Sequence, residues 1–182
     1  GVKDTSVRVQ TAAIIGLGRL GRPEAAIALL KTKVPASAVS PKKGTEGPHA
    51  TPNAAIIPAH LAVRALVDIN AVEACLDAVH KQESTLALWA LKYMHSTKAV
   101  DGLIEAYNNS NNSEYKNLIL ITLSRIYKKE APYDGSWWWS TRPDTHGPYY
   151  KSITWEASQQ IETFLVKEWK KASVKEKELF AD

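Results

Sequence analysis

The chain has 182 residues, of which 45% are hydrophobic and 23% charged, the composition of one globular domain with a sizeable core. Lysine and arginine outnumber aspartate and glutamate only by 23 to 19 and are scattered, so we do not expect a nucleic-acid partner. The single cysteine, Cys75, excludes a disulfide within the chain, and no apolar run reaches the length of a membrane span, so we do not expect membrane insertion.

The first predicted elements are two helices joined by a tight turn. Apolar residues recur on one face of a helix predicted over 5–20, and Thr5 or Ser6 can cap this helix. The residues of that face are Val9, Ala13, Leu17 and Leu20. A turn at Gly21 follows, and Pro23 suits the first turn of a second helix over 23–32.

A proline-rich insertion separates these helices from the next ones. Residues 34–53 hold several prolines and two glycines, which predicts an inserted loop. After it, the apolar spacing predicts helices over 55–69, 71–80, 84–95, 97–108 and 113–129. Cys75 falls on an apolar helical position, where a small core residue is expected.

The last third of the chain combines an aromatic loop with a long helix. Residues 131–154 are rich in tryptophan, tyrosine, proline and glycine, which predicts a loop. Thr154 is placed to cap a helix over 155–171, and a short helix over 173–180 can follow it. No segment shows the period-two alternation of a half-buried strand, so the sequence predicts an all-α protein.

The apolar pattern also repeats within the chain. A set of three residues recurs twice: Ala13, Leu17 and Leu20, then Ala62, Leu66 and Ile69, then Ala87, Leu91 and Met94. Fixed apolar spacing of this kind is typical of stacked helical units, each of which buries its apolar face against its neighbours. We therefore expect a single domain, 1–182, built as an α-solenoid of about four HEAT-like helical hairpins, with the aromatic loop and the long helix at its C-terminal end.

A glycine motif near the N-terminus offers an alternative of another class. Gly16, Gly18 and Gly21 match the G-x-G-x-x-G pattern of dinucleotide-binding oxidoreductases. That fold needs a second strand that ends in an acidic residue about 20 positions on, but 34–41 has no acidic residue and two prolines. We favour a structural role, in which Gly16 and Gly18 allow close helix packing and Gly21 ends the helix in a left-handed conformation.

No other pattern points to catalysis or to a bound cofactor. The five histidines lack the spacing of metal ligands, the serines lack the context of a nucleophile, and the carboxylates are dispersed. We expect no catalytic, cofactor-binding or metal-binding residue in this chain.

The aromatic loop is the best candidate for a specific interaction surface. Aromatic residues with arginine are the usual composition of binding hot spots. The candidate residues are Trp137, Trp138, Trp139, Arg142, Asp144, His146, Tyr149 and Tyr150. Three consecutive tryptophans of an extended segment cannot all point inward, so at least one is expected to remain available to a partner. The alternative is a structural lid folded over the last helices.

The aromatic loop, the residues that follow it and one predicted helix resemble a known family. In the loop region these parts of the chain are Gly135 to Trp139, Thr141-Arg142-Pro143-Asp144-Thr145-His146-Gly147-Pro148-Tyr149-Tyr150, and Thr154 to Glu156. The helix is His60 to Leu66. These parts of the chain resemble the HEAT-repeat module of large secreted haem-binding bacterial proteins. These multidomain proteins, of the planctomycete, verrucomicrobial and Bacteroidetes type, place a dehydrogenase-like domain before the module and a c-type cytochrome domain after it.

The resemblance sets the functional expectation. It implies a non-catalytic scaffold or protein-interaction module that lies within a larger, exported and redox-linked protein and works at the cell envelope, in the periplasm or outside the cell. The abrupt ends of the chain agree with a fragment of a longer protein. The expected partners are adjoining domains of the same polypeptide or another protein, and the expected contact surfaces are the concave face and the aromatic loop. A cytoplasmic scaffold without redox context is the remaining alternative.

Overall fold

The computed structural model describes residues 1–35, 54–81, 85–134, 151–172 and 177, and these are mostly helical. The α-helices in this part of the chain are α1 (Val7–Leu20), α2 (Ala25–Leu29), α3 (Ile57–Asp68), α4 (Val72–His80), α5 (Thr85–Leu91), α6 (Thr97–Asn109), α7 (Ser113–Arg125) and α8 (Ser158–Lys171). A 3-10 turn, η2 (Ala54–Ile56), precedes α3, and the strands β1 (Lys129–Glu130) and β2 (Ser152–Ile153) form an antiparallel pair. The all-α prediction is confirmed apart from this short strand pair.

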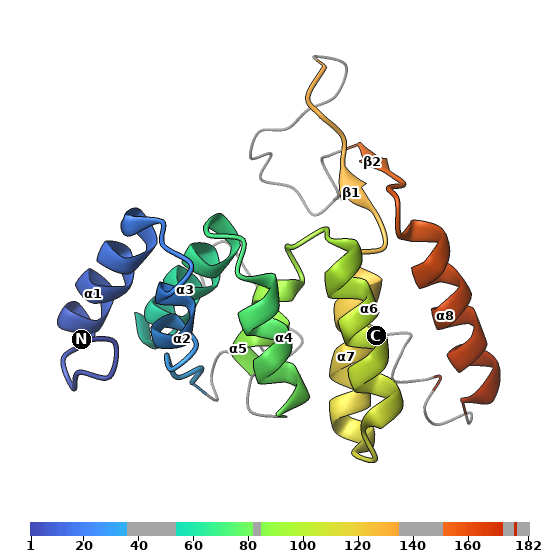
Figure 1. The fold of residues 1–182 in the computed structure, drawn as a ribbon, viewed down its shortest axis with the longest axis horizontal. Helices are drawn as coiled ribbons and strands as arrows, with labels where there is room; N and C mark the ends of the chain where they lie inside the picture. Colours follow the sequence, from blue (N-terminus) through green and yellow to red (C-terminus); the bar gives the residue numbers. More distant parts are fainter. Residues whose placement is uncertain (36–53, 82–84, 135–150, 173–176, 178–182) are drawn as a thin grey trace.

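The helices stack side by side in two rows (Figure 1). In one row α1 packs against α3, α3 against α5, and α5 against α7. In the other row α2 packs against α4 and α4 against α6, while α7 and α8 are in contact at the C-terminal end. Odd-numbered helices run in one direction and even-numbered helices in the other (Figure 1). The result is an elongated body in which each helix packs against the second helix after it in the chain, within the same row.

Most repeated apolar positions lie in the core. Leu66 and Leu91 are fully buried, as is Cys75, whose predicted core role is confirmed. The first copy is different: Ala13 and Leu17 are only half-buried, and Leu20 is 63% exposed. Ile14 is the residue that α1 buries instead. The reason is position, because α1 lies at the edge of the array and packs mainly on α3 and, to a smaller extent, on α2.

The glycine motif lies inside helix α1 and at its end. Gly21 has φ +63° and caps the helix, as predicted. A Cβ on Gly18 would lie 3.0 Å from the Cβ of Ala65 in α3, so the predicted close packing is confirmed there. Gly16 has no atom within 4 Å of such a Cβ, so the same prediction is wrong for Gly16. The glycines therefore do not form a turn between a strand and a helix N-terminus, which is the setting that a pyrophosphate site requires.

Helix boundaries depart from the prediction at the C-terminal end. The helix predicted over 113–129 begins as expected, and the Asn112 side chain caps it by accepting a hydrogen bond from the Tyr115 amide. The helix ends at Arg125, earlier than predicted, and the chain continues to β1. Thr154 is exposed and does not cap the last helix, which begins at Ser158. Most of the insertion predicted over 34–53 and of the helix predicted over 173–180 lies outside the described residues.

Candidate functional site

The residues predicted as an interaction surface lie outside the described part of the structure. Trp137, Trp138, Trp139, Arg142, Asp144, His146, Tyr149 and Tyr150 all fall within 135–150. What the structure describes is the base from which this segment leaves and to which it returns.

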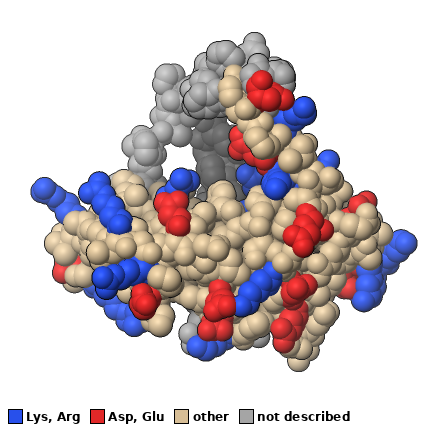
Figure 2. Space-filling model, turned by 45° about the horizontal axis from the view of Figure 1, so that its top comes forward, with Lys and Arg blue, Asp and Glu red and all other residues tan. Residues whose placement is uncertain are grey.

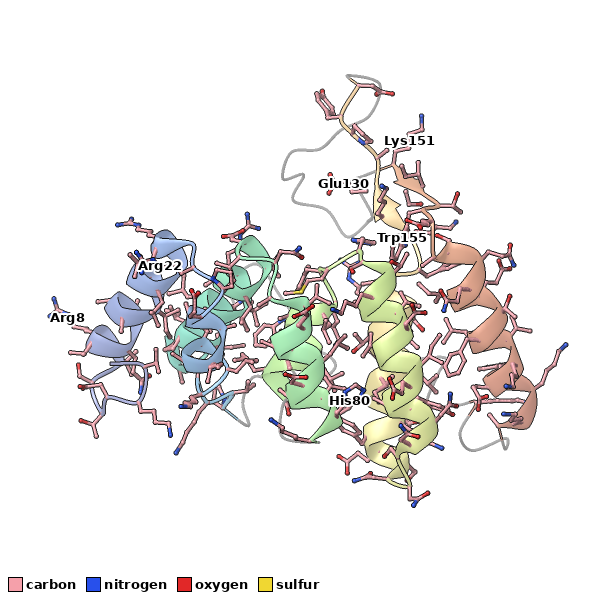
Figure 3. All side chains as sticks on the ribbon, in the orientation of Figure 1. Arg8, Arg22, His80, Glu130, Lys151 and Trp155 are labelled. Carbon is pink, nitrogen blue, oxygen red and sulfur yellow. The ribbon has the colours of Figure 1, made fainter. Side chains whose placement is uncertain are left out.

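The base is the strand pair and the residues next to it. Lys129 pairs with Ile153 and Glu130 with Ser152, so the chain before the segment lies beside the chain after it. The Ala131 amide extends the ladder by donating a 2.8 Å hydrogen bond to the Lys151 carbonyl. Figure 3 shows Glu130 and Lys151 on this projecting ladder, with Trp155 below it at the top of the helices.

Trp155 joins the base to the helical body. Its indole Nε1–H donates a 2.7 Å hydrogen bond to the Ile126 carbonyl. Its ring packs edge to face against the His95 ring, with 5.3 Å between the ring centroids. The Ser158 hydroxyl accepts a hydrogen bond from the Trp155 amide and donates one to the Tyr127 carbonyl. Trp155, which the sequence placed at the start of the predicted helix over 155–171, therefore has a structural role just before α8.

A groove lies on the even-numbered helices. It has a volume of about 710 Å³ and is bounded by α2, α4 and the start of α6. Its apolar lining consists of Pro23, Ala26, Ile27, Leu30, Ala71, Val72, Ala74 and Ala78. We call it the even-face groove. The small side chains of Ala74 and Ala78, one helical turn apart on α4, leave this space open.

Charged residues surround the even-face groove. Lys31 and Lys81 lie at the C-terminal ends of α2 and α4, which run in parallel, and neither pairs with a carboxylate among the described residues. At the other end Glu73 of α4 pairs with Lys98 of α6, and this contact lowers the pKa of the Glu73 carboxyl. Asp77 lies between the two ends. The groove is thus positive at one end and charge-balanced at the other.

Sequence reasoning expected a contact surface on the concave face but did not identify these residues. One signal was available within the repeat itself. Ile27 occupies the position that Glu73 and Asp101 occupy in the other copies, and it is 65% exposed. Ile27 therefore adds exposed apolar surface to the groove at a position that is acidic in the other two copies.

The described residues form neither a metal site nor a membrane span. No group of three or more histidine, cysteine, aspartate and glutamate side chains converges there to hold a metal ion. None of the described helices is both long and apolar enough to cross a membrane. Acidic and basic side chains are interspersed over the face shown in Figure 2.

Comparisons of this chain with protein-family models, with curated proteins and with solved structures found no match.

Proposed function

We propose that this chain is a non-catalytic protein-interaction module, an α-solenoid of about four HEAT-like helical hairpins that docks a neighbouring part of its parent protein in the even-face groove. The observation that carries the proposal is this groove, an open apolar strip between successive helices of one row. Stacked helical repeats commonly bind partners along such a surface because the stacking leaves one face of every second helix uncovered.

The proposed occupant is a polypeptide segment with one apolar side chain and one carboxylate. The apolar side chain would cover Ile27 and Ala78, whose exposed carbon surface gains from removal of water. The carboxylate would face Lys31 and Lys81, which lie together at one end of the groove without an acidic partner among the described residues. Charge of this kind gives orientation and specificity more than affinity.

The resemblance of the sequence supplies the rest of the proposal. The parent would be an exported, redox-linked protein of the cell envelope, and the docked segment would come from an adjoining domain of it. The aromatic residues of 131–154, Trp138 and Arg142 above all, would form a second contact surface. A cytoplasmic scaffold would have the same groove but no exported parent.

The gene around this chain tests the context. A signal sequence upstream and a Cys-x-x-Cys-His motif downstream are expected if the parent is exported and binds haem. Their absence from the complete gene would remove the redox context and leave the docking proposal standing.

Photo-crosslinking of the full parent polypeptide tests the docking itself. A benzophenone amino acid at position 27 is expected to crosslink to one identifiable segment outside the helical array, whereas the same group at Val166, which is exposed on α8, is not. The variant Ile27→Glu should abolish the interaction between the module and that segment, with Val166→Glu as the control. Equal crosslinking from both positions, or none from position 27, would contradict docking in the even-face groove.

The aromatic contact needs a separate experiment. A variant with both Trp138→Ala and Arg142→Ala is expected to weaken domain binding while the module stays folded. If the variant loses its fold but each folded molecule keeps its affinity, the segment is a structural lid and has no recognition role.

A further inference from the structure

Helix α1 has an apolar side that the described helices leave largely uncovered. It consists of Val9, Ala13, Gly16 and Leu20, which recur at the three- and four-residue spacing of one side of a helix. Val9 is 44% exposed and Leu20 is 63% exposed. Figure 1 shows α1 at the N-terminal end of the array, with α3 on one side of it and no described helix on the other. We call this side the outer face of α1.

The outer face lies opposite the contact between α1 and α3. Gly18 approaches α3 closely, because a Cβ on it would lie 3.0 Å from the Cβ of Ala65. Two positions along a helix correspond to a rotation of about 200°, so Gly16 lies on the side of α1 that faces away from α3. A Cβ on Gly16 would meet nothing within 4 Å among the described residues. One side of α1 is therefore packed against a helix, and the other side is open.

The internal repeat shows what this position does in the next copy. Gly16 in α1, Ala65 in α3 and Ala90 in α5 occupy the same position of the three copies, and all are small. Ala65 contacts the preceding odd-numbered helix, since its Cβ lies next to Gly18. Ala65 and Ala90 are buried, whereas Gly16 is exposed. Position 16 is therefore equivalent to a residue that packs against a preceding helix, and α1 has no such helix among the described residues.

The last residue of the outer face follows the same pattern. Leu20, Ile69 and Met94 are equivalent in the three copies. Ile69 is half-buried and Met94 is buried, whereas Leu20 is the most exposed of the three. Helical repeat arrays need end units with a polar outer side to remain soluble. The outer face of α1, with its exposed valine and leucine, has instead the composition of an interface between two repeats.

Two arginines lie along one edge of the outer face. Arg8 and Arg19 are exposed, and a separation of 11 positions places them on the same side of α1. Figure 3 shows Arg8 extending away from the array. A carboxylate on a bound partner could pair with either arginine, which would fix the orientation of the partner.

We propose that the outer face of α1 binds a further helix of the same kind, which another part of the parent polypeptide supplies and which runs parallel to α1. This helix carries a glycine or an alanine opposite Gly16, just as α1 carries Gly18 opposite Ala65. A carboxylate on it faces Arg8 or Arg19. The contact repeats the one between α1 and α3 and continues the row of odd-numbered helices by one step.

This inference rests on the proposed function in one respect, the existence of a longer parent polypeptide. The two surfaces are otherwise separate, because no residue of the outer face lines the even-face groove. Crosslinks from position 27 report on the groove and crosslinks from position 20 report on the outer face, so the failure of either proposal can be distinguished from the failure of the other.

Photo-crosslinking at position 20 of the full parent polypeptide tests the inference. A diazirine amino acid in place of Leu20 is expected to crosslink to one helical segment of the same polypeptide outside residues 1–182. The same amino acid in place of Ile121, which is 47% exposed on α7, is not expected to reach that segment. An equal mixture of isotope-labelled and unlabelled polypeptide separates contacts within one polypeptide from contacts between two copies.

Several results of this experiment would overturn the inference. Crosslinks between two copies would identify a second copy of the chain as the occupant, and crosslinks to a different protein would identify a foreign partner. Equal crosslinking from positions 20 and 121, or none from position 20, would show that the outer face has no specific occupant. A complete gene that encodes no helix outside this chain would have the same consequence.

Two substitutions of Gly16 test the close approach of the helices. Gly16→Gln is expected to lower the crosslink yield from position 20 by about tenfold, because its side chain holds the partner helix away. Gly16→Ala, which introduces the residue found in the other copies, is expected to keep the yield within about twofold. Neither variant should lower the melting temperature of the 182-residue chain, since a Cβ at position 16 meets nothing within 4 Å there. An unchanged yield with Gly16→Gln would contradict the inference.

Discussion

The indole Nε1–H of Trp155 donates a 2.7 Å hydrogen bond to the main-chain carbonyl of Ile126, 29 positions earlier in the chain. Ile126 is fully buried at the end of α7, and Trp155 lies just before α8. This hydrogen bond therefore joins the end of α7 to the start of α8 across the segment between them. It does so whatever that segment binds.

We predict that Trp155→Phe lowers the free energy of unfolding by about 1–2 kcal/mol, because it removes this hydrogen bond and part of the buried ring surface. Urea denaturation followed by circular dichroism measures the change. Trp169→Phe is the control, since Trp169 is 44% exposed on α8, and its effect should be clearly smaller. Equal effects would mean that the bond to Ile126 contributes nothing to stability.

The two glycines of α1 should respond in opposite directions to the same substitution. Gly16→Ala is expected to raise the free energy of unfolding by about 0.5–1 kcal/mol, because it removes a helix-interior glycine where a Cβ meets no atom within 4 Å. Gly18→Ala is expected to lower it by about 1 kcal/mol, because its Cβ would press on the Cβ of Ala65, which the backbone of α3 holds in place. Thermal denaturation of the pair decides the matter, and stabilisation by both substitutions would contradict the observed helix contact.

The buried Tyr115 hydroxyl connects two rows of helices. It donates a 2.6 Å hydrogen bond from α7 to the carbonyl of Val79 in α4. Tyr115→Phe should lower the free energy of unfolding by about 1 kcal/mol, whereas Tyr93→Phe, at a ring that is 49% exposed, should leave it within about 0.5 kcal/mol. Chemical denaturation of both variants is the measurement. A loss at Tyr93 as large as that at Tyr115 would refute the assignment.

Stability should fall at high pH because of Cys75. Burial raises the pKa of its thiol to about 12, whereas an exposed thiol in the unfolded chain has a pKa of about 8.5. Between these two values the unfolded chain has lost the proton and the folded chain has kept it, so the unfolded state binds fewer protons. The contribution is complete below about pH 8.5 and declines by about 1.4 kcal/mol per pH unit up to about pH 12.

Comparison of the wild type with Cys75→Ala separates the contribution of the Cys75 thiol to stability from that of the other groups that titrate at high pH. The variant should show a shallower decline of the free energy of unfolding across the alkaline range. Identical slopes for the two proteins would mean that the thiol is accessible in the folded state.

Local sequence accounts for the helices and for much of the core. The 3.6-residue spacing of apolar side chains depends only on near neighbours in the chain, so the segments around Leu66 and Leu91 could be predicted as buried helices. The left-handed end at Gly21 was predictable for the same reason, since only the local backbone decides it. Leu20 was predicted to lie on a buried face and Thr154 to cap the last helix, and both predictions were wrong. At these positions packing between distant segments overrides the local pattern.

The surfaces that carry the proposals were decided by tertiary structure. Ile27 comes to line a groove with Ala78 of α4 only because helices far apart in sequence stack at fixed spacing. For the same reason Ala65 packs against Gly18 while Gly16 stays open. Periodicity within one helix says which side is apolar but not which neighbour covers it, since the covering neighbour belongs to another segment of the chain. The sequence by itself therefore determined where helices form, and the stacking of those helices decided which side chains remain available for a partner.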